Sequence, residues 1–228
     1  MKAILIIHGF ADGVYETKYL IEYLNKYFDV FHFVLPKHDQ PVIKDVKYEE
    51  WIKKAEDEFL KLKDYKKIII IGHSMGGVIA TYLASKYKVH KLILLAPAFK
   101  IGNFKQVKKD VFKTKKEEDI YNRIFKTLKR IPLKTFIEFL KLINKYKDAP
   151  KKVDCNTLIL QGLQDEIVPL KSPQYVYDNL KSKKKHLKLI DNVRHKILIS
   201  EKKEKIFKYI KYYINGGLIW IIMKKSKI

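Results

Sequence analysis

Short apolar runs alternate with amphipathic stretches along most of the 228-residue chain. The apolar runs are rich in β-branched residues and too short for helices, which favours strands buried on both faces of a parallel sheet. The stretches between them have apolar residues at helical spacing. Predicted strands cover Lys2–Ile7, Val30–Leu35, Lys67–Ile71, Leu92–Ala96, Leu158–Gln161 and His186–Ile190, and predicted helices cover Tyr15–Lys26, Tyr48–Lys63, Val78–Lys86, Ser172–Asn179 and Glu201–Ile214. The pattern predicts an α/β fold, with a mostly parallel sheet of about six strands flanked by helices.

The alternation stops between Ala98 and Asp154, where no strand pattern is present. Two amphipathic stretches in this region, at 116–129 and 133–146, predict helices. Apolar residues fall on one face of each: Ile120, Ile124, Phe125 and Leu128 in the first, and Phe136, Phe139, Leu140 and Ile143 in the second. We expect a small helical cap over about 98–154, inserted in a domain of residues 1–215. Its apolar face would roof a site at the sheet edge or simply pack on the core, and the sequence leaves both open.

A strand-like run of four isoleucines leads into Gly72-His73-Ser74-Met75-Gly76, followed by a helix-forming segment. This arrangement resembles the nucleophile elbow of the α/β-hydrolase fold, in which a sharp strand-to-helix turn exposes a serine hydroxyl beside a general base. Glycine is expected at 72 and 76 because a Cβ there would collide with the neighbouring backbone. Ser74 is therefore the candidate nucleophile. We expect His73 to have a structural role in the turn.

The resemblance implies that an acid and then a histidine follow the serine along the chain. Asp165 comes just after a short apolar strand and matches the acid position of the family's G-x-x-D-x-x-V-P pattern, which favours it over the adjacent Glu166. His195 lies in a loop after the last predicted strand, where the family carries its base. His186 opens a strand and His90 precedes the acid in the chain, so both fit the order less well than His195.

An acyl-transfer intermediate also needs backbone N–H groups for its oxyanion, normally one after the nucleophile and one from the loop after an early strand. Met75 follows the nucleophile. The first predicted strand turns at His8-Gly9-Phe10, so the amide of Phe10 is the second candidate.

Taken together, these motifs resemble small carboxylesterases and monoacylglycerol lipases with a helical cap. The resemblance implies hydrolysis of carboxylic esters, such as short- to medium-chain acyl esters or monoacylglycerols, through an acyl-enzyme on Ser74 and without a metal or organic cofactor. A thioesterase, lysophospholipase, amidase or carbon–carbon bond hydrolase on the same scaffold is an open alternative, because the fold does not determine the bond that is cleaved. A second open alternative is a non-catalytic protein that has this scaffold and acts at a membrane surface or as a binding protein.

The formal net charge of +23 suggests polyanion binding only if the charge is clustered. The lysines are instead spread over nearly every predicted helix, and only three arginines are present. Arginine is the usual residue for bidentate phosphate and base recognition, so we expect no specific nucleic-acid partner. Weak contact with an anionic membrane surface stays open, and the expected partner is a small-molecule ester.

Cys155 is the single cysteine, which rules out an intramolecular disulfide. The opening apolar run is too short for a signal peptide and no stretch is long enough to span a bilayer, so we expect a cytoplasmic protein. The cysteine and histidine spacing matches no zinc pattern. The last segment, 216–228, is an apolar and lysine-containing extension of unassigned role.

Overall fold

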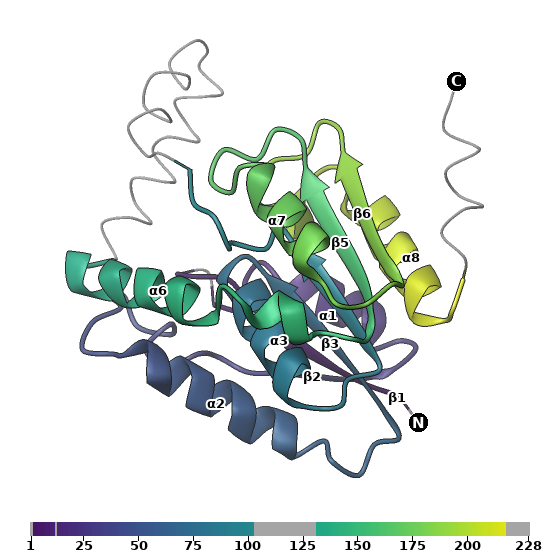
Figure 1. Ribbon diagram of the computed structural model, residues 1–228, viewed down its shortest axis with the longest axis horizontal. Coiled ribbons are helices and arrows are strands. Elements are labelled where there is room, and N and C mark those ends of the chain that lie inside the picture. Colours follow the sequence, from purple (N-terminus) through teal and green to yellow (C-terminus); the bar gives the residue numbers. More distant parts are fainter. Residues whose placement is uncertain (1, 12, 103–130, 218–228) are drawn as a thin grey trace.

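The computed structural model describes residues 2–11, 13–102 and 131–217 (Figure 1). Its centre is a six-stranded sheet with the order β2-β1-β3-β4-β5-β6, in which every neighbouring pair is parallel. The strands are β1 (Lys2–Ile7), β2 (Asp29–His32), β3 (Lys67–His73), β4 (Lys91–Leu95), β5 (Asn156–Gly162) and β6 (Lys185–Ile190). The predicted α/β fold with a parallel sheet is confirmed.

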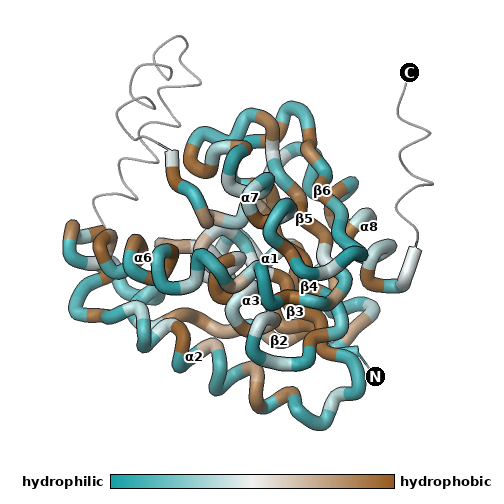
Figure 2. Tube along the Cα trace, in the orientation of Figure 1, coloured by the Kyte–Doolittle hydropathy of each residue, from teal (hydrophilic) through white to brown (hydrophobic). Residues whose placement is uncertain are grey.

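Helices cover both faces of this sheet, and alternate side chains of each central strand meet a different helical layer. The α-helices are α1 (Lys18–Leu24), α2 (Tyr48–Leu60), α3 (Met75–Lys86), α6 (Leu133–Tyr146), α7 (Lys171–Asn179) and α8 (Lys203–Ile214), and the short 3₁₀ turns are η1 (Ala149–Lys152) and η2 (Ile197–Ile199). On β1, Leu5 and Ile7 pack toward α2 and α3, while Ile4 and Ile6 pack toward α1 and α8. In Figure 2 the strands form the apolar interior, and hydrophilic residues dominate the surrounding helices.

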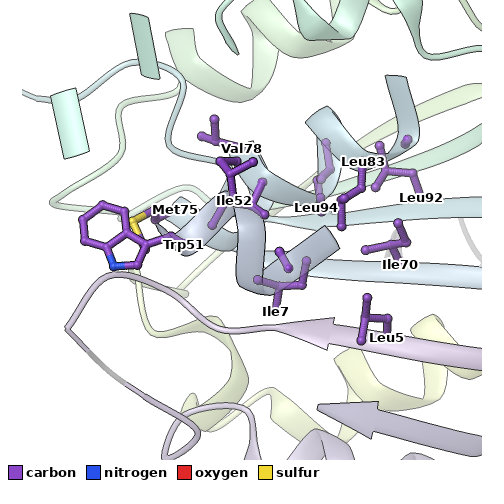
Figure 3. Packing of buried hydrophobic residues seen from close by; sticks show 14 of the residues in the cluster. Leu5, Ile7, Trp51, Ile52, Ile70, Met75, Val78, Leu83, Leu92 and Leu94 are labelled. Atoms are coloured by element: carbon purple, nitrogen blue, oxygen red, sulfur yellow. The ribbon is translucent and has the colours of Figure 1, made fainter. Parts of the chain in front are cut away.

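The layer that contains α2 and α3 holds the larger core (Figure 3). Trp51 and Ile52 of α2 pack with Met75 and Val78 of α3 over the strands, and Trp51 and Met75 are fully buried. Apolar contacts with α2 therefore fix the position of the first turn of α3.

Four predicted elements are shorter in the structure. Helix α2 ends at Leu60 rather than at Lys63, and helix α8 begins at Lys203 rather than at Glu201. Strand β2 ends at His32 rather than at Leu35, because it is an edge strand with mostly exposed residues. Helix α1 begins at Lys18 rather than at Tyr15. The residues before it form turns in which the Thr17 hydroxyl donates to the Val14 carbonyl, and Glu16 is fully buried.

Of the predicted cap, helix α6 has the predicted bounds, whereas the first predicted helix, at 116–129, lies outside the described residues. Helix α6 packs against α2 and α3, with Phe139 and Leu142 in the core. Of the four residues on the predicted apolar face, Phe139 is buried, Phe136 and Ile143 are partly buried against the core, and Leu140 is 42% exposed. The face toward the core carries Thr135, Phe139 and Leu142, a helical stripe offset from the predicted one.

The strand order reverses between β1 and β3, which makes this pair the topological switch point of the sheet. In open parallel sheets the loops at the carboxyl ends of the strands on either side of such a point form the usual binding crevice. The loop after β1 contains Phe10, and the turn after β3 contains Ser74. The fold thus brings both candidate segments to one edge.

Candidate active site

Ser74 occupies a sharp turn between β3 and α3, with φ 52° and ψ −117°. A non-glycine residue rarely adopts such a conformation, which costs roughly 1–3 kcal/mol and persists only where the surrounding structure enforces it. Here the enforcement comes from close backbone packing. A Cβ at Gly72 would overlap the Gly76 carbonyl, and a Cβ at Gly76 would overlap the carbonyls of Ile7 and His8. The glycines of the motif therefore let β3, α3 and the end of β1 approach one another.

The three side chains predicted to act together form one continuous chain of contacts. Nε2 of His195 lies 3.1 Å from Oγ of Ser74. On the other side of the ring, Nδ1 lies 2.9 Å from Oδ2 of Asp165 and 3.1 Å from Oδ1. Ser74 and His195 are both buried, with exposed fractions of 6% and 4%. The three candidate side chains, from loops after β3, β6 and β5, thus meet within hydrogen-bonding distance.

Asp165 is held by donors on both carboxylate oxygens. The backbone N–H groups of Ile167 and Val168 donate to Oδ1 at 2.9 and 2.8 Å. The side-chain amide of Gln161 donates to Oδ2 at 2.7 Å. Burial by itself raises the pKa of Asp165, but the His195 imidazole and these backbone amides outweigh it and hold that pKa below its usual range. The carboxylate is therefore kept ionised and fixed in orientation.

The charge and tautomer of His195 follow from these neighbours. Because the Asp165 carboxylate is an acceptor, Nδ1 carries the ring proton and Nε2 is left to accept one from Ser74. Burial by itself lowers the pKa of His195, but Asp165, followed by Glu16 and Glu166, outweighs burial and raises that pKa to about 9.

The loops that carry the acid and the base are tied to each other. A Cβ at Gly162 would overlap the Val193 carbonyl, so glycine at the end of β5 lets the two loops come into contact. Gln164 binds Val193 through both its backbone N–H and its side-chain oxygen, at 3.1 and 3.2 Å. The backbone N–H of His195 donates to Glu166 Oε2 at 3.3 Å. Glu166, weighed above as an alternative acid, thus binds the base's backbone rather than its ring.

The two amides proposed for an oxyanion lie at the same edge. Met75 is the first residue of α3, and the first N–H groups of an α-helix have no acceptor inside the helix. Within the described part of the chain, the backbone N–H of Phe10 also donates to no protein acceptor. A Cβ on the preceding Gly9 would lie 3.2 Å from Cβ of Ser74, so the Phe10 loop passes close to the nucleophile.

Side chains around that loop hold it in place. His8 accepts a hydrogen bond from Leu35 N–H at Nε2, 3.0 Å away, and its Nδ1 lies 2.8 Å from the Gly9 carbonyl. The Phe10 ring stacks on Phe139 of α6 with centroids 4.8 Å apart and meets Trp51 edge-on at 5.7 Å. The segment after β2, helix α2 and helix α6 therefore all contact this loop and fix its position.

The competing histidines lie elsewhere. His90 precedes β4, where its backbone N–H donates to the Ile68 carbonyl near the amino end of β3. His186 is on β6, with its ring 6.4 Å from that of Tyr213 in α8. His73 follows the prediction of a structural role, since its Nε2 lies 3.2 Å from the His195 carbonyl oxygen.

Residues 2–11, 13–102 and 131–217 contain neither a metal-binding cluster nor a membrane-spanning helix. No group of three or more His, Cys, Asp or Glu side chains in these ranges is placed to hold a metal ion. No helix in them has the length and apolar character needed to cross a bilayer.

Residues 2–111 match the family profile described as alpha/beta hydrolase fold, and residues 105–203 match the profile described as serine aminopeptidase, S33. The chain has the α/β-hydrolase fold. This α/β-hydrolase is 22% identical over 219 residues to a carboxylesterase of Bacillus subtilis, covering 89% of the chain and 88% of the relative.

Solved structures share the fold of this α/β-hydrolase. A structure from work on the metagenome-derived lipolytic enzymes LipS and LipT has a TM-score of 0.78 at 16% identity, covering 95% of this chain and 94% of that one. The monoacylglycerol lipase of Paleococcus ferrophilus has a TM-score of 0.72 at 20% identity, with coverage of 92% and 93%. At such identities the likeness concerns the fold.

Gln161 and Glu16 take part in the site and were not predicted. Gln161 precedes Gly162 on a buried strand, and a polar residue inside an apolar run was the available signal. Glu16 sits in a segment whose pattern predicts a helix, so nothing in the sequence marked it as buried.

Proposed function

We propose that this α/β-hydrolase is a serine esterase that cleaves carboxylic esters through an acyl-enzyme on Ser74. The observation that carries the proposal is the unbroken contact chain from Ser74 Oγ through both nitrogens of His195 to Asp165. A hydroxyl is a weak nucleophile at neutral pH, and a neighbouring imidazole oriented by a carboxylate is the usual means of activating it.

In the proposed reaction, Nε2 of His195 takes the proton of Ser74 as Oγ attacks the ester carbonyl. Asp165 keeps the ring in the Nδ1–H tautomer and stabilises the imidazolium. The amides of Phe10 and Met75 donate to the oxyanion of the tetrahedral intermediate. His195 then protonates the leaving alcohol, and a water molecule repeats the sequence to release the acid.

Short- to medium-chain acyl esters or monoacylglycerols are the proposed substrates. The named carboxylesterase and monoacylglycerol lipase relatives support this class. The partly buried ring of Phe10, which stacks on the buried ring of Phe139, places aromatic surface in the loop beside Ser74. Residues 98–154 are proposed to act as a cap. Within the described part of this segment, α6 is its α-helix.

Initial rates on p-nitrophenyl esters of increasing acyl length, compared with acyl-thioesters and lysophospholipids, test the proposal. We expect the highest kcat/KM on carboxylic esters and a fall of several orders of magnitude for Ser74→Ala. A higher kcat/KM on thioesters or lysolipids would assign a different hydrolase activity to the same residues. Ester hydrolysis retained in Ser74→Ala would refute the proposal.

A further inference from the structure

Glu16 is a carboxylate with no exposed surface and no part in the proposed reaction. It lies in the turns between β1 and α1, with Oε1 3.4 Å from Nε2 of His73. Charged side chains are rarely buried fully unless they are paired, because desolvating the charge is costly. A buried Glu beside the nucleophile's neighbour therefore calls for a specific role.

His73 connects this carboxylate to the catalytic base. The same Nε2 atom lies 3.2 Å from the backbone carbonyl oxygen of His195, and the two imidazole rings are 5.1 Å apart between centroids. A carboxylate oxygen and a carbonyl oxygen both accept hydrogen bonds, so a nitrogen that faces both must carry a proton. His73 thus donates from Nε2 to the His195 carbonyl, while Glu16 Oε1 lies at ion-pair distance from the same nitrogen.

This arrangement joins two loops and the end of β3 at one nitrogen atom. Glu16 comes from the segment after β1, which also carries Phe10; His73 directly precedes Ser74; and His195 lies in the loop after β6. The backbone of the base is held from one side by His73 and from the other by Glu166. Fixing the carbonyl of His195 limits how far its ring can move away from Ser74.

We propose that Glu16 and His73 are positioning residues for the base, with Glu16 acting as a second buried carboxylate behind His195. The pair holds the His195 backbone, and the Glu16 charge favours the imidazolium that forms when Ser74 is deprotonated. The proposal rests on the proposed function, in which His195 is the base.

The charged and titratable groups facing His195 are Asp165 and Glu166 from the loop after β5, Glu16 from the loop after β1, and His73 from the end of β3. Glu16 ranks after Asp165 and ahead of Glu166 among the charges that raise the pKa of His195. An opposite charge in direct contact shifts a pKa by roughly 1–3 units, and the shift falls with distance, so a carboxylate one residue behind the base is expected to contribute about one unit.

The test is the pH dependence of kcat/KM on a p-nitrophenyl ester for the wild type, Glu16→Gln and Glu22→Gln. Glu16→Gln keeps the shape of the side chain and removes its charge. Glu22 is an exposed residue of α1 that pairs with Lys18. Its substitution also removes one negative charge, but at a position outside the site. We expect the midpoint of the rise in kcat/KM with pH, which reports the titration of His195, to move roughly one pH unit lower in Glu16→Gln and not to move in Glu22→Gln.

A folded Glu16→Gln protein whose limb coincides with that of the wild type would overturn the inference. Failure of the proposed function is distinguishable, because the wild type itself would then show no Ser74-dependent activity.

If Glu16→Gln does not fold, ¹⁵N NMR of the histidine rings in the wild type tests the pair directly. The signal of His73 would be identified by its loss in His73→Phe. We expect protonated Nε2 at His73, and an unprotonated Nε2 would overturn the inference.

Discussion

The glycine at position 76 offers a direct way to disturb the elbow without touching a reacting group. In Gly76→Ala the new Cβ would lie 2.5 Å from the His8 carbonyl oxygen, whereas ordinary contact begins at 3.4 Å. The Ile7 carbonyl oxygen would be closer still, so the backbones of β1 and α3 must separate by at least about 0.9 Å, and neither can yield through a side-chain rotation. Because Ser74 directly precedes α3 and Phe10 follows β1, this separation moves Ser74 away from the Phe10 amide.

A displacement of about 1 Å at a reacting centre costs on the order of 100-fold in rate, so we expect kcat/KM of Gly76→Ala to fall by about that factor. Overpacking costs roughly 1–3 kcal/mol of stability, against a gain of up to about 1 kcal/mol from replacing glycine in a helix. Ester hydrolysis and urea unfolding, measured on the same preparation, give both quantities.

Gly77→Ala is the matched control. Its Cβ would lie 3.1 Å from two atoms of Pro97, a contact that a shift of a few tenths of an ångström relieves. We expect a far smaller loss of activity than for Gly76→Ala. Equal activity and stability in the two variants would refute the claim that backbone crowding at Gly76 fixes the elbow.

Four further predictions follow from the site. Nε2 of His195 must be unprotonated to accept a proton, so kcat/KM should rise with pH up to about 9 and then level. The folding stability that the raised pKa of His195 contributes is present in full below the pKa of the unfolded chain, and it is lost as pH rises through about 9. A rate profile that is flat from pH 6 to 9 would contradict this prediction. Asp165→Asn should lower kcat by about 10⁴-fold through the wrong tautomer, with little change in its circular dichroism. Gln161→Leu removes a hydrogen bond to a charged group and should lower kcat by about 10-fold, measured under saturating ester, and an unchanged kcat would exclude a positioning role. Phe139→Ala should cost about 3 kcal/mol in urea unfolding, since the ring is buried, while Leu140→Ala, at an exposed position, should stay within about 0.5 kcal/mol.

The parts of the fold predicted from sequence are those with a local physical cause. The isoleucine run of β3 and the glycines around Ser74 have a pattern that permits few other structures, and the order of Ser74, Asp165 and His195 follows from the resemblance to known hydrolases. Helix α6 was predicted with its bounds because its amphipathic period is regular over four turns.

Features that depend on which elements become neighbours were not predicted. The buried stripe of α6 is offset from the predicted one because its partners are α2 and α3, whose position the sequence does not reveal. The burial of Glu16 depends on turns that replace the first part of a predicted helix. The hydrogen bond from Gln161 to Asp165 requires the chain to return after β5.

The measurement that tests the central claim most directly is the site of covalent modification by a fluorophosphonate, located by peptide mass spectrometry. We predict a single adduct on Ser74 in the wild type, no adduct in Ser74→Ala, and labelling slowed by several orders of magnitude in His195→Ala. An adduct on another residue, or labelling at the wild-type rate in His195→Ala, would contradict the account.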